Sequence, residues 1–158
     1  MSVWRSSTTA ILVGGLVVVI IAAAIAFMVS TFRPMVSVEI GSGVFNLVIA
    51  KDDPSRVTGL SGVDKLNPND GLLMAFASDY TWEIWMKDMK VPIDILWLDS
   101  SKEIIYIVKN VGPELSTSKI FRPNTKARYV IELPAGSANN YGISVGEKLE
   151  FDVGEVKE

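Results

Sequence analysis

The stretch EIWMKDMKVPIDILWLD, residues 83–99, decides how the chain folds, because it places charged side chains inside a run that otherwise resembles buried core. These charged residues are Lys87, Asp88 and Lys90. Pro92 has no N–H to donate to a strand ladder, so it is confined to strand edges, starts and bulges. The stretch is therefore expected to divide into two strands, joined by a bent connector that carries the charges.

Short segments rich in alternating or β-branched residues surround this stretch, which is typical of strands. The expected strands are VSVEI (36–40), VFNLVIA (44–50), GLLMAF (71–76), WEIWMK (82–87), IDILWL (93–98), EIIYIVK (103–109), RYVIEL (128–133) and KLEFDV (148–153). One short helix is expected from Asp53-Pro54, and a second short helix or turn within residues 134–142. The sequence therefore predicts a mainly β (α+β) domain, a small β-barrel or β-sandwich-like fold, with no helix long enough for a doubly wound α/β fold.

The N-terminal part of the chain has a different composition, since residues 10–29 contain no charged residue. A helix of about 20 residues, at ~1.5 Å per residue, spans the ~30 Å hydrocarbon layer of a bilayer. The sequence therefore predicts a tail at 1–9, a single-pass transmembrane helix at 10–31 and a tether at 32–35. The β domain then covers 36–158 and is expected outside the cytoplasm. A cleaved signal peptide is the competing interpretation, although its apolar region is usually only about 7 to 15 residues.

Composition excludes several kinds of chemistry. The chain has no cysteine and no histidine, so it lacks every thiol nucleophile, every lipidated cysteine, and the usual ligands of zinc, copper and haem. No cofactor is expected. Residues 36–158 carry all 18 acidic residues but only 13 of the 15 basic ones. Because affinity for nucleic acid comes from clustered Lys and Arg, nucleic acid is not an expected partner. The expected partners are the lipid bilayer, through residues 10–31, and another membrane protein or a component of the cell envelope.

The connector and its flanks supply the candidate site residues. The expected binding residues are Trp85, Met86, Lys87, Asp88, Pro92 and Asp94. Asp88 and Asp94 form a carboxylate pair of the kind used in acid/base catalysis, although lysines beside them could simply neutralise them as surface ion pairs. Trp82 and Trp85 point to opposite faces of one strand, so one of the two rings is expected to be exposed or covered only by a loop. No catalytic residue is assigned.

Several motifs together make the chain resemble the DUF192 family, an uncharacterised group of bacterial and archaeal proteins. These motifs are RVTGLSG (56–62), GLLMAF (71–76), WMKDMKVPIDILWLD (85–99), VGP (111–113) and YVIELPAGSANNYGISVGEKL (129–149). Asp88 and Met89 stand where the family pattern has Asn and Thr. The resemblance implies a compact, mainly β domain, frequently exported, with no established activity. Its carried-over positions are Gly59, Leu60, Trp85, Met86, Lys87, Pro92, Asp94, Pro134, Ala135, Gly136 and Gly146.

Three hypotheses of function follow. The first is a membrane-anchored, extracytoplasmic binding or interaction domain of unknown ligand, with a contact surface formed by the Trp85 to Asp94 connector and the 114–126 loop. The second is an envelope enzyme that uses Asp88 or Asp94 as a general base and Lys87 as an electrostatic stabiliser. The third is an accessory subunit of a membrane protein complex, recognised through small residues in the N-terminal helix.

Overall fold

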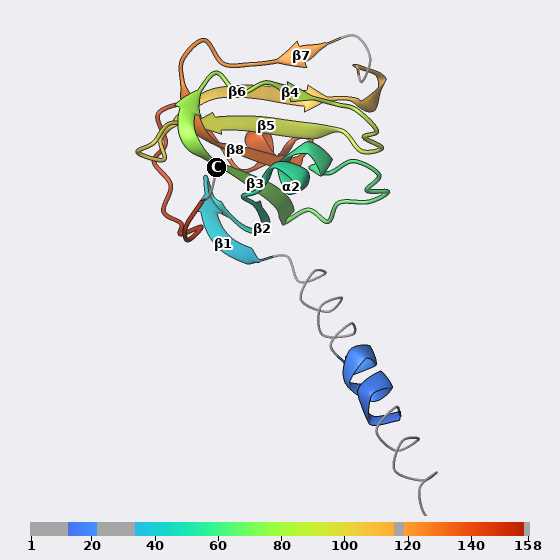
Figure 1. Cartoon of the computed structure of the whole chain (residues 1–158). Helices are drawn as coiled ribbons and strands as arrows, with labels where there is room; N and C mark the ends of the chain where they lie inside the picture. Colours follow the sequence, from blue (N-terminus) through green and yellow to red (C-terminus); the bar gives the residue numbers. More distant parts are fainter. Residues whose placement is uncertain (1–12, 22–33, 116–118, 157–158) are drawn as a thin grey trace, which may run out of the picture. The chain divides into compact units, whose positions relative to one another are not determined.

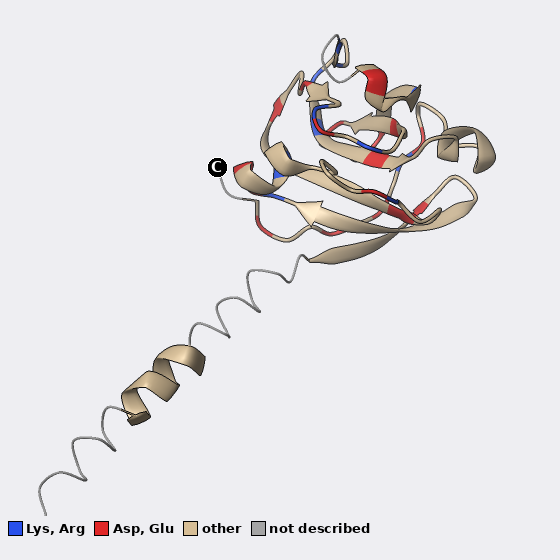
Figure 2. Cartoon of the chain, turned by 90° about the vertical axis from the view of Figure 1, so that its right-hand side faces the viewer, with Lys and Arg blue, Asp and Glu red and all other residues tan. Residues whose placement is uncertain are grey.

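The computed structural model describes residues 13–21, 34–115 and 119–156 (Figure 1). These residues fall into two compact units, Met1–Arg33 and Pro34–Glu158. In the first unit, residues 13–21 are helical and carry no charged side chain (Figure 2).

The predicted single-pass membrane architecture is wrong for this part of the chain. Within the described residues, no helix is both long enough and apolar enough to cross a membrane. The remainder of the predicted span, residues 10–12 and 22–31, lies outside the described residues.

The second unit is mainly β, with a six-stranded sheet and few helices (Figure 1). The sheet has the strand order β1-β2-β3-β8-β5-β6, and a separate two-stranded ribbon pairs β4 with β7. The strands are β1 (Met35–Ile40), β2 (Gly43–Ala50), β3 (Asp70–Tyr80), β4 (Ile84–Trp85), β5 (Ile93–Leu98), β6 (Ile104–Val111), β7 (Ile120–Phe121) and β8 (Ala127–Pro134). The helices are α2 (Asp53–Thr58), the 3-10 helix η1 (Pro113–Leu115) and α3 (Ser137–Asn140).

The sheet is mixed, because β2 and β3 run parallel while the other neighbouring strands are antiparallel. A parallel pair needs a crossover connection rather than a tight turn. Residues 51–69, which include the short α2, provide this connection. The six-stranded sheet is open rather than closed into a barrel, because its edge strands β1 and β6 do not pair with each other. This main sheet has an apolar layer on each face.

The two apolar layers follow from the alternation of side chains along the central strands. On β5, Ile93, Ile95 and Trp97 belong to one buried cluster, whereas Leu96 and Leu98 belong to the other. All six residues of β5 are buried. The first layer includes residues from the segments around α2, β4 and β7, and the second includes residues from α3 and the C-terminal segment. A strand that is buried on both faces has a nearly continuous apolar sequence, as IDILWL has.

Several elements differ in extent from the sequence prediction. The strand predicted at 71–76 extends to Tyr80, with an irregular register after Ala75. The strand predicted at 82–87 is reduced to β4. The strand predicted at 148–153 is replaced by a single bridge between Glu103 and Lys148. The predicted 114–126 loop contains most of η1 and the whole of β7, and residues 116–118 lie outside the described part of the chain.

Asp94 is the one polar residue of β5, and it is fully buried. Its Oδ1 accepts hydrogen bonds from the backbone N–H groups of Asn110, at 2.7 Å, and Gly136, at 3.2 Å. Its Oδ2 accepts one from the backbone N–H of Ala138, at 2.8 Å. The carboxylate therefore joins β5 to the end of β6 and to α3. These hydrogen bonds give Asp94 a structural role in the fold.

Replacing Asp94 should destabilise the domain strongly. Asp94→Ala leaves three backbone donors without their acceptor, and each hydrogen bond to a charged group is worth about 1.5–3 kcal/mol. We expect the free energy of unfolding, measured by denaturant titration, to fall by about 3 kcal/mol or more. Asp88→Asn is the matched control, because Asp88 is exposed and its φ of 56° is a conformation that Asn tolerates. Equal losses in the two variants would contradict this role for Asp94.

Candidate functional site

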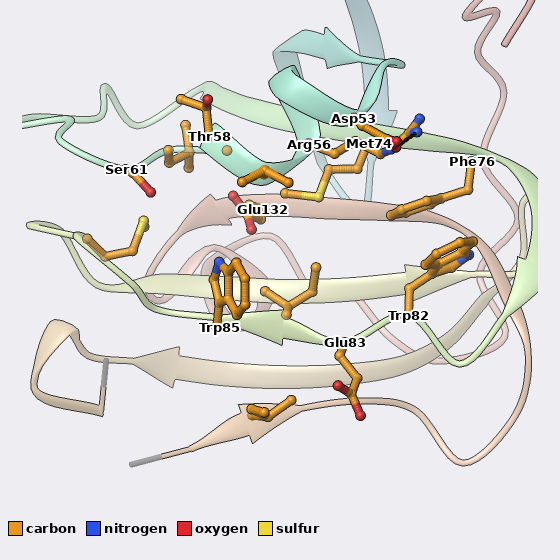
Figure 3. Close-up of a pocket in the computed structure, with 16 residues that line it drawn as sticks. Asp53, Arg56, Thr58, Ser61, Met74, Phe76, Trp82, Glu83, Trp85 and Glu132 are labelled. Carbon is orange, nitrogen blue, oxygen red and sulfur yellow. Dashed lines mark hydrogen bonds and ion pairs between the residues drawn. The ribbon is translucent and has the colours of Figure 1, made fainter. Parts of the chain in front are cut away.

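A cavity of about 310 Å³ lies on the first apolar layer, between α2 and the segment that includes β4 (Figure 3). The residues that line it come from α2 and the turn after it, from the sheet, and from the segments around β4 and β7. They are Asp53, Arg56, Val57, Thr58, Gly59, Leu60, Ser61, Met74, Phe76, Trp82, Glu83, Ile84, Trp85, Met89, Ile120 and Glu132.

The end of α2 forms one wall of the cavity. The helix begins with a capping box, in which Asp52 Oδ1 accepts from the Ser55 N–H, and it has Pro54 in its first turn. It ends at Gly59, whose φ is +51°. A Cβ at this position would lie 3.4 Å from Met74 Cε and 3.9 Å from Glu132 Oε2. These are ordinary van der Waals distances, so the positive φ of the turn, rather than lack of space, favours glycine here.

Aromatic side chains form one end of the cavity. The rings of Phe76 and Trp82 stack with their centroids 3.9 Å apart and their planes at 11°. The Arg56 guanidinium lies 5.1 Å from the centre of the Phe76 ring, donates to the Ala75 carbonyl and pairs with Asp53. These contacts hold the Arg56 side chain in place, and only 12% of that side chain is exposed.

The cavity has an exposed mouth and a buried floor. Trp85, Ile120 and Val57 are 51%, 57% and 63% exposed. Glu132 is only 3% exposed. Figure 3 shows Glu132 with α2 on one side and the indole rings of Trp85 and Trp82 on the other. The cavity therefore leads from an aromatic and aliphatic rim to a carboxyl group.

Glu132 has no hydrogen-bond partner for its buried Oε2 among the described residues. It lies on β8, in the middle of the sheet, where its neighbours across the sheet are Leu72 on β3 and Ile95 on β5. Both are apolar and fully buried. Burial without compensation raises the pKa of the Glu132 carboxyl to about 7. A buried carboxyl with a strongly raised pKa in a cavity is a common feature of functional sites.

The structure brings only one of the predicted binding residues, Trp85, into the cavity wall. Met86 is fully buried in the core. Lys87 and Asp88 are exposed, and their backbone carbonyls accept from Ser61 Oγ, at 2.9 Å, and from the Gly62 N–H, at 2.8 Å. The connector therefore holds the turn after α2 in place.

The remaining connector residues also serve the fold. Pro92 is exposed, and its carbonyl accepts from the Ala135 N–H at 3.2 Å. Asp94 is buried with its three amide donors, whereas Lys87 and Asp88 are exposed, and none of these three residues lines the cavity. The cavity therefore contains none of the three residues on which the enzyme hypothesis depends.

Glu132 is the main functional candidate that the sequence analysis missed. The signal was present in RYVIEL, because alternation along the strand places Glu132 on the same face as Val130, which belongs to the buried layer. A charged residue on the inward face of a strand is unusual unless it is paired. The expectation that either Trp82 or Trp85 is exposed is met by Trp85, while Trp82 is partly buried against Phe76.

A family model described as an uncharacterized ACR, DUF192, matches residues 36–151. The chain belongs to the DUF192 family. A UPF0127 protein of Thermococcus gammatolerans is 29% identical over 106 residues, which cover 65% of this chain and 64% of that protein. The match therefore spans less than two thirds of that relative's length. Four of the five DUF192 motifs quoted above contribute residues to the cavity wall.

Two solved structures share this fold. A candidate transcription regulator from Sinorhizobium meliloti 1021 has a TM-score of 0.68 and 29% identity, covering 75% of this chain and 93% of that one. A protein of unknown function from Novosphingobium aromaticivorans has a TM-score of 0.67 and 21% identity, covering 75% of this chain and 85% of that one. The second likeness concerns the fold alone.

The raised pKa of Glu132 predicts how stability depends on pH. Its ordinary pKa is 4.5, and the folded value is about 7, so between these values the folded state binds more protons than the unfolded state. Stability then falls as pH rises, and the penalty above pH 7 is about 3 kcal/mol. Glu132→Gln removes this titration. The free energy of unfolding of the variant, minus that of the wild type, should therefore increase by about 3 kcal/mol between pH 4 and pH 8.

The matched control for this experiment is Glu150→Gln, because Glu150 is exposed. Its free energy of unfolding, measured by denaturant titration at the same series of pH values, should stay parallel to that of the wild type. A difference between Glu132→Gln and wild type that does not change with pH would show that Glu132 titrates normally.

Proposed function

We propose that residues 34–158 form a binding domain for a small organic ligand, and that the ligand occupies the cavity beside α2. One observation carries this proposal, namely that the buried Glu132 carboxyl, whose Oε2 has no hydrogen-bond partner among the described residues, lies at the floor of a mostly apolar cavity. Ligand sites are usually concave and mostly apolar, with a few polar groups that fix the ligand's orientation. The cavity of about 310 Å³ lies at the lower end of the size range of such sites.

The rim supports the same proposal. Trp85, Ile120 and Val57 are large apolar side chains, and each is more than half exposed at the mouth of the cavity. Exposed apolar area of this kind costs free energy unless something covers it. A ligand with an apolar or aromatic body would bury these three side chains, and its polar group could reach Glu132.

Binding is favoured over catalysis by the state of the other reactive groups in the cavity. The hydroxyl groups of Thr58 and Ser61 already donate to the carbonyls of Pro54 and Lys87. A nucleophile would need a base that accepts its proton, and neither hydroxyl donates to Glu132. The binding hypothesis from the sequence is therefore kept, but its surface moves from the charged connector to the cavity, with Trp85 in common.

The extracytoplasmic location of the domain and a partner from the cell envelope stay predictions of the sequence, and the proposed site depends on neither. Transcription regulation, the candidate role of the Sinorhizobium protein, is not carried over to this chain. Acidic and basic residues are interspersed in the 34–158 unit (Figure 2), and residues 36–158 have an excess of acidic ones. Such a charge distribution does not favour a nucleic-acid surface.

Narrowing the mouth of the cavity tests the proposal. Small aromatic and aliphatic fragments that bind the full-length protein would be found by ligand-observed NMR. Ile120→Trp places a larger ring at the mouth, on a short exposed strand that favours aromatic residues. We expect the affinity for these fragments to fall at least tenfold in this variant, a loss of about 1.4 kcal/mol of binding free energy.

Val145→Trp is the matched control, because Val145 is 59% exposed and does not line the cavity. Its affinity for the same fragments should equal that of the wild type. Unchanged binding in Ile120→Trp, or an equal loss in both variants, would mean that the fragments bind elsewhere.

A further inference from the structure

We propose that the cavity binds a small organic cation, a protonated amine on an apolar or aromatic body, with its ammonium group at Glu132. This inference rests on the proposed function and adds the chemical class of the ligand. It depends on three features of the described residues, namely the missing partner of Glu132, the balance of charge in the cavity, and the aromatic rings along its wall.

The first feature is the kind of partner that Glu132 lacks. Oε2 is a hydrogen-bond acceptor, and its neighbours across the sheet, Leu72 and Ile95, have no donor to offer. The indole N–H of Trp82 is also buried without a partner, but in Figure 3 it points away from Glu132. A ligand that completes the site must therefore bring a donor to the floor. A protonated amine brings both N–H donors and a positive charge, and charge-assisted hydrogen bonds are about twice as strong as neutral ones.

The second feature is the balance of charge. Four ionisable residues line the cavity, namely Asp53, Arg56, Glu83 and Glu132. Asp53 pairs with Arg56, and Glu83 pairs with Arg122 at 3.3 Å. Glu132 has no ion-pair partner among the described residues. Once Glu132 is ionised, the cavity therefore has one uncompensated negative charge, which a single ligand cation would neutralise. A ligand anion would instead be repelled.

The third feature is the aromatic wall. Trp85 lines the cavity beside the stacked pair Phe76 and Trp82. The faces of aromatic rings attract cations, and Trp is the most favourable ring for this interaction. Arg56 already uses the Phe76 ring in this way, at 5.1 Å. A ligand cation would place its ammonium group beside the Glu132 carboxylate and its apolar body against Trp85, Met74 and Met89.

Binding of a cation should be linked to the protonation of Glu132. The carboxyl, with a pKa of about 7 in the free protein, must ionise to pair with an ammonium group. Below pH 7 each binding event therefore releases a proton, and affinity should increase up to tenfold per pH unit until it levels off above pH 7. The three other ionisable groups that face the cavity, Asp53, Arg56 and Glu83, are already paired.

The test uses three probes that share one body and differ in charge, 2-phenylethylamine as the cation, 2-phenylethanol as the neutral probe and phenylacetate as the anion. Each is titrated into the full-length protein at pH 8 and at pH 5.5, with the indole N–H signals of Trp82 and Trp85 followed by NMR. At pH 8 we expect the amine to bind at least tenfold more tightly than the alcohol, and phenylacetate to bind most weakly. At pH 5.5 the preference for the amine should be largely lost.

Glu132→Gln keeps the shape of the side chain but removes its charge, so it should abolish both the preference for the amine and its dependence on pH. Glu150→Gln, at an exposed position outside the cavity, should keep both. If Glu132→Gln fails to fold, the pH dependence of the wild type decides alone, because it needs no variant.

The outcomes separate this inference from the proposed function. If the alcohol or phenylacetate binds as tightly as the amine at pH 8 and shifts the Trp85 signal, the cavity is a binding site but not a cation site. A preference for the amine that persists in Glu132→Gln would also overturn the inference. If none of the three probes shifts the Trp85 signal at either pH, both the proposed function and the inference fail.

Discussion

The structure depends on the burial of both faces of β5 and β8, because a side chain on either strand faces one of two apolar layers. A polar side chain on these strands must find its partners within the protein or remain without them. The two strands contain two buried carboxyl groups, those of Asp94 and Glu132, which differ in their hydrogen-bond partners. Asp94 faces the layer of α3 and accepts three backbone hydrogen bonds, whereas Glu132 faces the layer of α2 and its Oε2 accepts none.

This contrast indicates different roles for the two residues. Asp94 stabilises the fold, since its partners come from β6 and α3, which are distant in the sequence. Glu132 destabilises the free protein, because its charge is buried without compensation. Unfavourable features of this kind concentrate at sites that act on another molecule, where a ligand supplies what the protein lacks. The difference in partners, rather than the presence of a carboxylate, therefore distinguishes the structural residue from the functional candidate.

The sequence predicted most of the strands. A strand buried on one face has alternating apolar residues, and a strand buried on both faces has a continuous apolar run. The sequence also predicted the short helix that begins at Asp53-Pro54 but not the parallel pairing of β2 and β3, because a helix of six residues does not indicate a crossover. For the site, it identified Trp85 from the two-sided strand pattern. It missed Glu132, although alternation in RYVIEL places this residue on the same face as Val130, because the pattern alone does not show whether a buried carboxyl has a partner. Lys87 and Asp88 were chosen for their charges, and the sequence did not indicate that their backbone carbonyls contact the turn after α2.

The charged connector and the cavity are nevertheless coupled. Residues 87 and 88 accept hydrogen bonds from Ser61 and Gly62, and Lys90 pairs with Asp64 at 2.7 Å. These contacts fix the turn that carries Gly59 over the cavity floor, so the charges lie in solvent while the backbone beneath them shapes the site. A ligand that supplied the missing donor to Glu132 would remove part of the free-energy cost of its burial. By linkage, it would then stabilise the folded domain in proportion to its occupancy of the cavity. The same buried carboxyl thus makes the free domain less stable and makes its stability responsive to the ligand.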